Sequence, residues 1–102
     1  MHEINQTERF TINPEIMYTF IDQETIIIST IDDKMFGLNE LATELLKQME
    51  DSAVSIHDLV NYVLNHYEVS EEQCREDVTT IMESLVADQL IISQVNPAHH
   101  PE

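Results

Sequence analysis

The chain has 102 residues, of which 42% are hydrophobic, which is enough for one compact domain. Twenty acidic residues against four basic ones give a formal net charge of −16, which disfavours nucleic acids and anionic membranes as partners. A protein or peptide partner is the remaining broad expectation, although the same acidity also keeps a small protein soluble. The single cysteine excludes an internal disulfide and a cysteine-based zinc cluster. No apolar run approaches the roughly 18 residues of a membrane span, and no secretory signal opens the chain, so we expect a cytoplasmic protein.

The first third of the chain predicts an antiparallel meander. Residues 1–14 are polar and mixed, and we expect them to form an arm without assigned structure. Residues 16–22 and 25–31 are rich in β-branched and aromatic side chains, which favour strands. A hairpin loop at residues 22–24 and a turn at Asp32-Asp33 would connect them to a further strand at residues 34–38, with Lys34, Phe36 and Leu38 on one side.

After Asn39 the spacing of apolar residues becomes helical, which predicts three helices. Asn39 is a natural N-cap for the first helix, and Ser55 with Asp58 predicts a capping box for the second. Ser70 with Gln73 predicts another capping box for a last helix that runs to about residue 87. Its apolar stripe comprises Cys74, Val78, Ile81, Met82, Leu85 and Val86.

The order of elements predicts an α+β fold, a three-stranded antiparallel sheet followed by three helices in a winged helix-turn-helix arrangement. Residues 90–92 read as a short extended segment after the last helix. We divide the chain into an N-terminal arm (residues 1–14), a folded domain (residues 15–93) and a flexible tail (residues 94–102).

The residues that an enzyme needs are missing from the pattern. Cys74 lies on an apolar stripe, where a buried inert thiol is expected, and His57 and His66 have no partner specified by the sequence. The pair His99-His100 falls in the expected tail, and the acidic pairs lack the spacing of a calcium loop. With a single glycine in the chain, a phosphate-binding glycine-rich loop is excluded. We therefore expect no enzyme activity, no cofactor and no metal site.

Gly37 and the strand that carries it are the best candidates for a binding feature. An outer strand of a meander has unpaired backbone groups, and an open edge beside a helix can accept an extended peptide as an added strand. Gly37 has two interpretations, which stay open: it leaves room for a docked peptide, or it allows a bend into the first helix.

The segment from about Ile26 to Ile92 resembles the PqqD family, also called the RiPP recognition element. The resemblance rests on MFGLNE at residues 35–40, on the two helices that follow, and on YEVSEE at residues 67–72 with REDV at residues 75–78. Leu85 and Leu90-Ile91 follow in register. The chain departs from the family at Asp33, near Asp51 and at Gln89, where glycine is common, so the resemblance leaves its particular pathway undecided.

This resemblance implies a non-catalytic peptide chaperone of natural product biosynthesis. Such a protein binds the leader segment of a ribosomally made precursor and presents it to a modifying enzyme, which would be a radical-SAM maturase, a leader peptidase or a cyclase. The leader would add as a strand beside residues 34–38, in a groove walled by the last helix. Carried over by position, the peptide-binding residues are Lys34, Met35, Phe36, Gly37, Leu38, Arg75, Val78, Thr79 and Met82.

Several alternatives remain beside this interpretation. Lys34 and Arg75 would meet carboxylates of an acidic leader, but Arg75 is also four residues from Glu71 and can pair with it locally. Phe36 and Leu38 fit ordinary core positions equally well. The main alternative function is an acidic adaptor or DNA mimic that binds a basic protein. A winged-helix DNA-binding regulator is disfavoured by the acidic last helix. The open edge is compatible with either a monomer or a homodimer.

Overall fold

The computed structural model describes residues 5–30 and 33–94. This part of the chain has an α+β fold, with the predicted three-stranded antiparallel sheet, three helices and a second small sheet. In chain order the elements are β1 (Arg9–Ile12), β2 (Ile16–Ile21), β3 (Glu24–Ser29), β4 (Met35–Leu38), α1 (Glu40–Gln48), β5 (Val54–Ser55), α2 (Ile56–His66), α3 (Glu71–Ala87) and β6 (Ile91–Ser93).

The predicted meander is the sheet formed by β2, β3 and β4. Its side chains alternate, so that Ile16 and Ile27 enter the core while Met17 and Ile28 face outward. The connection between β2 and β3 is tight because Asp22 adopts a φ of 58°, a conformation that Asp tolerates. Of the predicted Asp32-Asp33 turn, Asp33 has a φ of 57°, and Asp32 lies outside the described residues.

The helix starts are confirmed at all three predicted caps. The Asn39 side chain accepts a hydrogen bond from the backbone N–H of Ala42 at 2.9 Å. Ser55 and Asp58 form the reciprocal capping box, and each of its two hydrogen bonds is 3.1 Å long. Ser70 caps α3 through the N–H of Gln73, but the Gln73 side chain donates to Asp77 rather than completing a box.

The structure differs from the expectation for residues 1–14, because part of this segment forms the strand β1. This strand lies between β5 and β6 in a second antiparallel sheet, with Phe10 opposite Val54 on one side and Ser93 on the other. Phe10 is fully buried in the main core, which holds the strand in place. The remaining boundaries of the arm, the domain and the tail stay a prediction.

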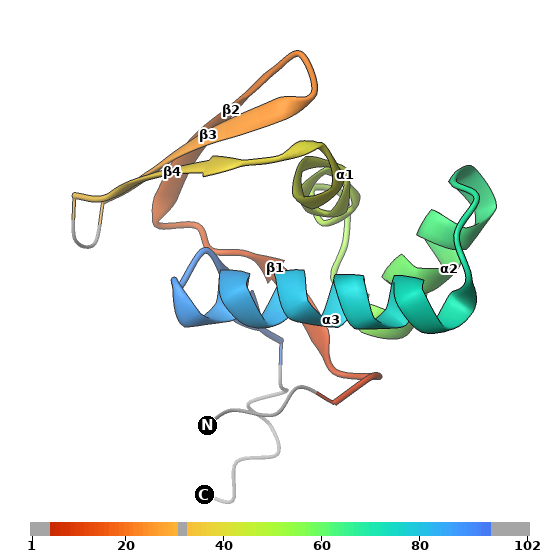
Figure 1. Ribbon diagram of the computed structural model, residues 1–102. Helices are drawn as coiled ribbons and strands as arrows, with labels where there is room; N and C mark the ends of the chain where they lie inside the picture. The colour runs from red at the N-terminus through yellow and green to blue at the C-terminus, as the bar shows by residue number, and fades with distance from the viewer. Residues whose placement is uncertain (1–4, 31–32, 95–102) are drawn as a thin grey trace, which may run out of the picture.

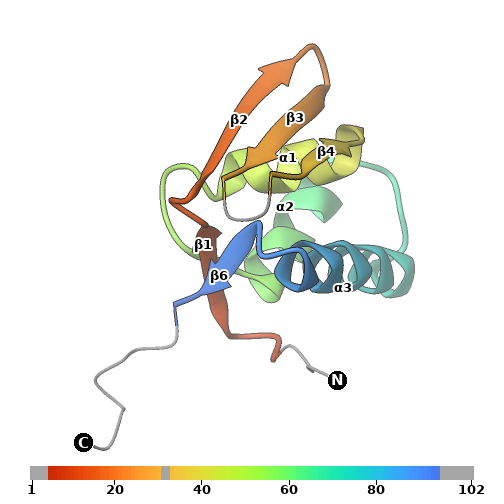
Figure 2. The same cartoon turned by 90° about the vertical axis from the view of Figure 1, so that its left-hand side faces the viewer.

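The three helices surround one core beneath the first sheet. α1 packs on the inner face of β3 and β4, α2 packs on α3, and α3 also contacts β6. Figure 1 shows α3 running below β4 and α1. In the rotated view β1 and β6 lie side by side below the β2–β3–β4 sheet (Figure 2). The arrangement leaves β4 at the border of its sheet, on the side that faces α3.

Candidate functional site

An open strand edge runs along β4. This strand pairs with β3 on one side only in the described part of the chain. The backbone N–H of Ser29 donates to the carbonyl of Lys34 at 2.9 Å, which identifies these opposite residues as a hydrogen-bonded pair. Such pairs alternate along an antiparallel ladder, so Phe36 and Leu38 also direct their backbone groups toward β3. The N–H and C=O groups of Met35 and Gly37 consequently point outward from the sheet.

A groove lies between this edge and α3. Its first part is a shallow cavity of about 170 Å³. One wall comes from the end of β4 and the start of α1, and the other comes from one flank of α3. The residues lining it are Gly37, Leu38, Asn39, Ala42, Ile81, Ser84 and Leu85.

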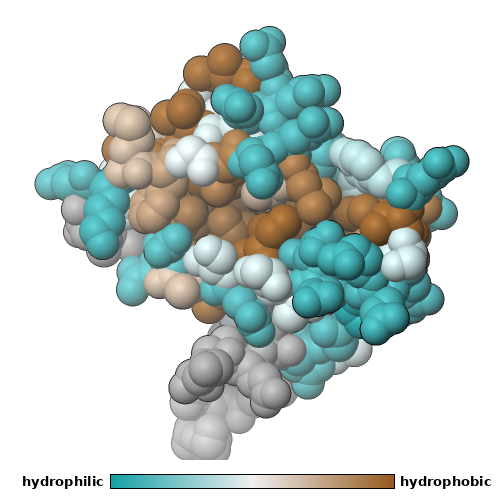
Figure 3. Space-filling model, in the orientation of Figure 1, coloured by the Kyte–Doolittle hydropathy of each residue, from teal (hydrophilic) through white to brown (hydrophobic). Residues whose placement is uncertain are grey.

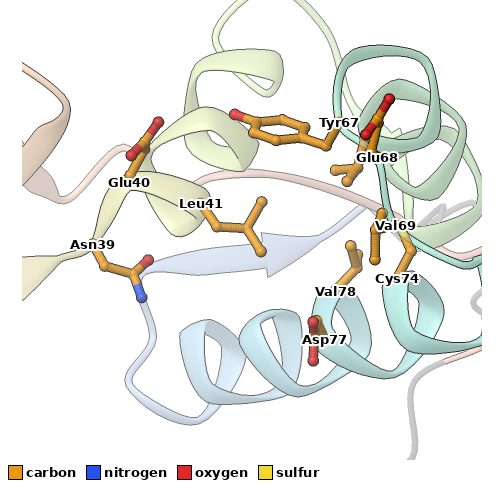
Figure 4. A pocket seen from close by; sticks show the side chains of 10 residues that line it. Asn39, Glu40, Leu41, Tyr67, Glu68, Val69, Cys74, Asp77 and Val78 are labelled. Atoms are coloured by element: carbon orange, nitrogen blue, oxygen red, sulfur yellow. The ribbon is translucent and has the colours of Figure 1, made fainter.

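The groove continues into a larger cavity of about 420 Å³. Asn39 lines both cavities, so the two adjoin at the junction of β4 and α1. The floor is apolar and comes from α1, α2, α3 and the α2–α3 connection, through Leu41, Val63, Val69, Cys74 and Val78. Figure 4 shows the Tyr67 ring reaching toward Glu40 along one rim, with Asp77 at the opposite rim.

The face of the molecule that carries the two cavities also has an apolar surface. In the orientation of Figure 1, apolar residues gather in a band across the molecule, bordered by hydrophilic side chains (Figure 3). Met35 contributes to the exposed apolar surface, since 70% of its area is accessible. An apolar groove beside unpaired backbone groups suits an extended peptide, because backbone hydrogen bonds provide affinity and side-chain pockets provide selectivity.

Burial, and after it the nearby carboxylates, raise the pKa of two groups at the larger cavity. Burial and the nearby carboxylates of Glu44 and Glu40 raise the pKa of Tyr67 above its ordinary value. Burial, followed by the negative charge of Asp77, raises the pKa of the Cys74 thiol. Cys74 is also 2% exposed, and its Sγ contacts the Val60 carbonyl at 3.8 Å. A thiol in this state is a poor nucleophile.

The predicted peptide-binding residues of β4 fall into two groups, one exposed at the open edge and one packed against the core. Met35 and Gly37 are exposed at the open edge. Phe36 and Leu38 are half-buried and pack against the core, so they hold the strand in place, and Leu38 also lines the smaller cavity. Lys34 is exposed directly before β4, and its backbone carbonyl belongs to the ladder with β3.

The predicted residues of α3 are not brought together in the groove. Val78 and Met82 are fully buried, although Val78 forms part of the floor of the larger cavity. Arg75 and Thr79 lie on the other flank of the helix, where they line a separate open surface depression with Gln6. Arg75 donates to Gln6 Oε1 at 2.7 Å and to Glu71 Oε2 at 2.8 Å. The local Glu71–Arg75 pair, which the sequence left as an alternative, is therefore formed.

The groove flank of α3 consists of residues that sequence reasoning did not select. Asp77, Ile81 and Ser84 are spaced three or four residues apart, and each lines one of the two cavities. Ile81 belongs to the predicted apolar stripe but is only half-buried. Asn39 was predicted only as a cap, and Leu41 belongs to the helical apolar pattern that follows it. Both residues also line the groove, and this depends on how β4, α1 and α3 pack together in the fold.

In residues 5–30 and 33–94, no cluster of three or more His, Cys, Asp and Glu side chains could hold a metal ion. No helix in this part of the chain combines the length and the apolar character needed to cross a membrane. The pair His99-His100 lies outside the described residues.

Comparison with known protein families decides the family. The model of PqqD, described as coenzyme PQQ synthesis protein D, matches residues 24–91, which is most of the chain. The chain belongs to the PqqD family. The match begins at the first residue of β3 and ends at the first residue of β6, so it includes β4, α1 and α3, which form the groove. No curated protein matches this PqqD-family chain significantly.

Two solved structures share the fold of this PqqD-family chain. One is described as TbiB1 in complex with the TbiA(beta) leader peptide; it has a TM-score of 0.74 and 16% sequence identity, and the match covers 84% of this chain and 96% of that one. The other is a lasso peptide synthetase B1 complexed with the leader peptide, with a TM-score of 0.71 and 20% identity, covering 81% of this chain and 96% of that one. At these identities the likeness establishes the fold.

Proposed function

We propose that this chain binds the leader segment of a ribosomally synthesised precursor peptide and presents it to a modifying enzyme. The leader adds as a strand to the outer edge of β4, and its side chains enter the groove between β4 and α3. The observation that carries this proposal is the outward direction of the Met35 and Gly37 backbone groups beside an apolar groove. Membership of the PqqD family and the leader-bound state of both structural neighbours support it.

The position of Gly37 supports the same proposal. Gly37 lies in extended backbone with no positive φ, and a Cβ added there would meet no atom within 4 Å. Neither the backbone conformation nor internal packing therefore requires glycine at this position. Open space at residue 37 favours the docking interpretation over a bend into α1.

The proposal also includes the arrangement of the helices and the division of labour between this chain and the modifying enzyme. We infer that α2 and α3, joined by the short connection 67–70, form a helix-turn-helix and that the β2–β3–β4 sheet is its wing. The chain contributes binding and orientation without catalysis, and a radical-SAM maturase, a leader peptidase or a cyclase in the cytoplasm acts on the bound precursor. The raised pKa of the buried Cys74 thiol is consistent with this division of labour.

The test is a titration of the purified protein with fluorescent leader peptides encoded beside its gene, using two variants of one residue. Met35→Pro removes the outward N–H and obstructs the edge, whereas Met35→Ala keeps that N–H and removes only the side chain. We expect micromolar or tighter binding, at least roughly tenfold weaker for Met35→Pro, in line with the loss of one or two backbone hydrogen bonds. Met35→Ala should stay much closer to the wild type.

Both variants must first show wild-type circular dichroism and melting. Leader binding that survives Met35→Pro unchanged would contradict strand addition at β4. A folded protein that binds none of these leaders would contradict leader capture and favour the acidic adaptor. In that case binding to a basic protein should weaken steeply with added salt.

A further inference from the structure

The charge of the groove specifies which leader fits it. Three carboxylates stand around the larger cavity, from Glu40 at the start of α1, Glu68 in the α2–α3 connection and Asp77 on α3. Asp77 accepts a hydrogen bond from Gln73, and neither Glu40 nor Glu68 makes an ion pair with a described residue. An acidic rim above an apolar floor attracts a ligand that carries both a cation and an apolar side chain.

The basic residues of the chain do not offset this charge at the groove. Arg9 pairs with Asp58, and Lys47 pairs with Glu44 and lies over the Phe20 ring. Arg75 pairs with Glu71 on the other flank of α3. Lys34 lies directly before β4 and lines neither cavity, so among the described residues no Lys or Arg lines the groove. The structure does not support the acidic leader that Lys34 and Arg75 suggested, because Arg75 lies on the other flank of α3 and Lys34 lines neither cavity.

We propose that the leader bound by this chain is basic and amphipathic, with an apolar side chain that fills the larger cavity and a Lys or Arg beside it that meets Glu40, Glu68 and Asp77. This inference rests on the proposed function and names the chemical class of its ligand. The net charge of −16 additionally attracts a cationic peptide from a distance.

The geometry also places the basic residue in the leader. The peptide strand lies beside Met35 and Gly37, and the acidic rim begins at Glu40, three residues past Gly37 along the chain. At about 3.3 Å per extended residue, that offset is roughly 10 Å. The Lys or Arg should therefore lie about two to four residues outside the strand-forming segment of the leader, at its end nearest α1.

The test uses a display library of random 16-residue peptides selected on the purified full-length protein. The enriched peptides should contain an apolar residue next to Lys or Arg, and Asp and Glu should be depleted from those positions. The double variant Glu68→Lys/Asp77→Lys should invert this preference, so that the basic peptides bind at least tenfold more weakly and acidic variants of the same peptides gain affinity.

A matched control separates the groove from general attraction to an acidic protein. Glu83→Lys with Glu24→Lys makes the same change in net charge at exposed positions that line neither cavity. This control should keep the selected peptides within about threefold of their original affinity at 0.15 M salt, where distant surface charges are largely screened. Circular dichroism and thermal melting establish that each variant is folded.

The outcomes distinguish this inference from the proposed function. Equal losses in the groove variant and the control variant would overturn the inference, because bulk charge would then explain the preference. Enrichment of acidic or uncharged peptides that still lose affinity in Met35→Pro would also overturn it and leave strand addition at β4 intact. If the folded protein selected no peptides and also bound none of the leaders encoded beside its gene, both the inference and the proposed function would be wrong.

Discussion

The hydroxyl oxygens of Thr25 and Thr43 lie 2.6 Å apart in the core, with both side chains fully buried. Thr25 belongs to β3 opposite Leu38 of β4, and Thr43 belongs to α1. This hydrogen bond therefore ties the helix that forms one wall of the groove to the sheet that carries the open edge. A polar link in an apolar setting also favours one fixed position of α1 over others.

Loss of one of these two hydroxyls should be costlier than loss of both. Thr25→Val leaves the buried Thr43 hydroxyl with only the Leu38 carbonyl as a partner, at a long distance of 3.5 Å, which should lower the free energy of unfolding by about 1–3 kcal/mol. The double variant Thr25→Val/Thr43→Val removes both polar groups and should recover part of that loss. Urea denaturation of the two single variants and the double variant measures the coupling, and strictly additive losses would contradict the expected link.

Ile81 and Met82 are adjacent in sequence but should respond differently to substitution. Ile81 is half-buried at the groove, so Ile81→Ser should weaken leader binding roughly tenfold with only a small change in stability. Met82 is fully buried, so Met82→Ala should lower the free energy of unfolding by about 2–4 kcal/mol through the cavity that it leaves. Leader titrations and chemical denaturation of the two variants test these expectations. Equal losses of leader affinity and of stability in the two variants would contradict the placement of Ile81 at the groove and Met82 in the core.

Arg75→Ala should leave leader binding nearly unchanged. Its guanidinium is engaged by Gln6 and Glu71 on the flank of α3 that faces away from the groove. The half-exposed ion pair contributes about 0.5 kcal/mol or less, so the melting temperature should fall only slightly. A tenfold loss of leader affinity in the folded Arg75→Ala variant would place the ligand on the opposite flank of α3.

Removal of the N-terminal strand should unfold the domain even though the family match begins at Glu24. Phe10 is fully buried and anchors β1 between β5 and β6, so Phe10→Ala should lower the free energy of unfolding by about 3–5 kcal/mol. Deletion of residues 1–14 should have a larger effect. Thermal denaturation of both proteins tests this, and a deletion variant that melts like the wild type would show that residues 1–14 are a dispensable arm.

The buried Cys74 thiol should be protected from labelling in the folded protein, and its raised pKa should make the protein less stable at alkaline pH. Its pKa is raised chiefly by burial, so the folded state binds the thiol proton more tightly than the unfolded state does. This contribution to stability is complete below the unfolded pKa, near 8.5, and decreases as the pH rises toward the folded value. Thiol labelling with a disulfide reagent should be slow in native protein and fast in urea, and rapid native labelling would contradict the burial.

The starts of the helices were predictable because they depend on neighbouring residues. Asn39, Ser55 and Ser70 each precede an apolar pattern of helical period, and each forms its cap. The meander was predictable for the same reason, since alternation and β-branching act within each strand. β1 was missed because four residues of mixed polarity carry little signal, and its partners lie about 45 and about 80 residues away in the sequence.

The groove residues of α3 were harder to predict for a physical reason. Sequence spacing separates the Arg75 and Thr79 flank from the Asp77 and Ile81 flank, but it does not say which flank will face β4. That choice is made by packing against β4, α1 and the N-terminal segment. Val78 and Met82 were selected both as core and as peptide-binding residues, and full burial of both now establishes the core role.

The pairing of β1 with β6 has a consequence for how such a module can be carried by larger proteins. Phe10 lies opposite Ser93, the Gln94 N–H donates to the Arg9 carbonyl, and Ser93 donates to Glu8, so the two ends of the described chain adjoin. A module whose ends meet can be spliced into a surface loop of a host without being pulled apart. Joining of its ends and reopening of the chain at another surface loop should also be tolerated, so we expect a circularly permuted version to serve as an affinity tag for precursor peptides.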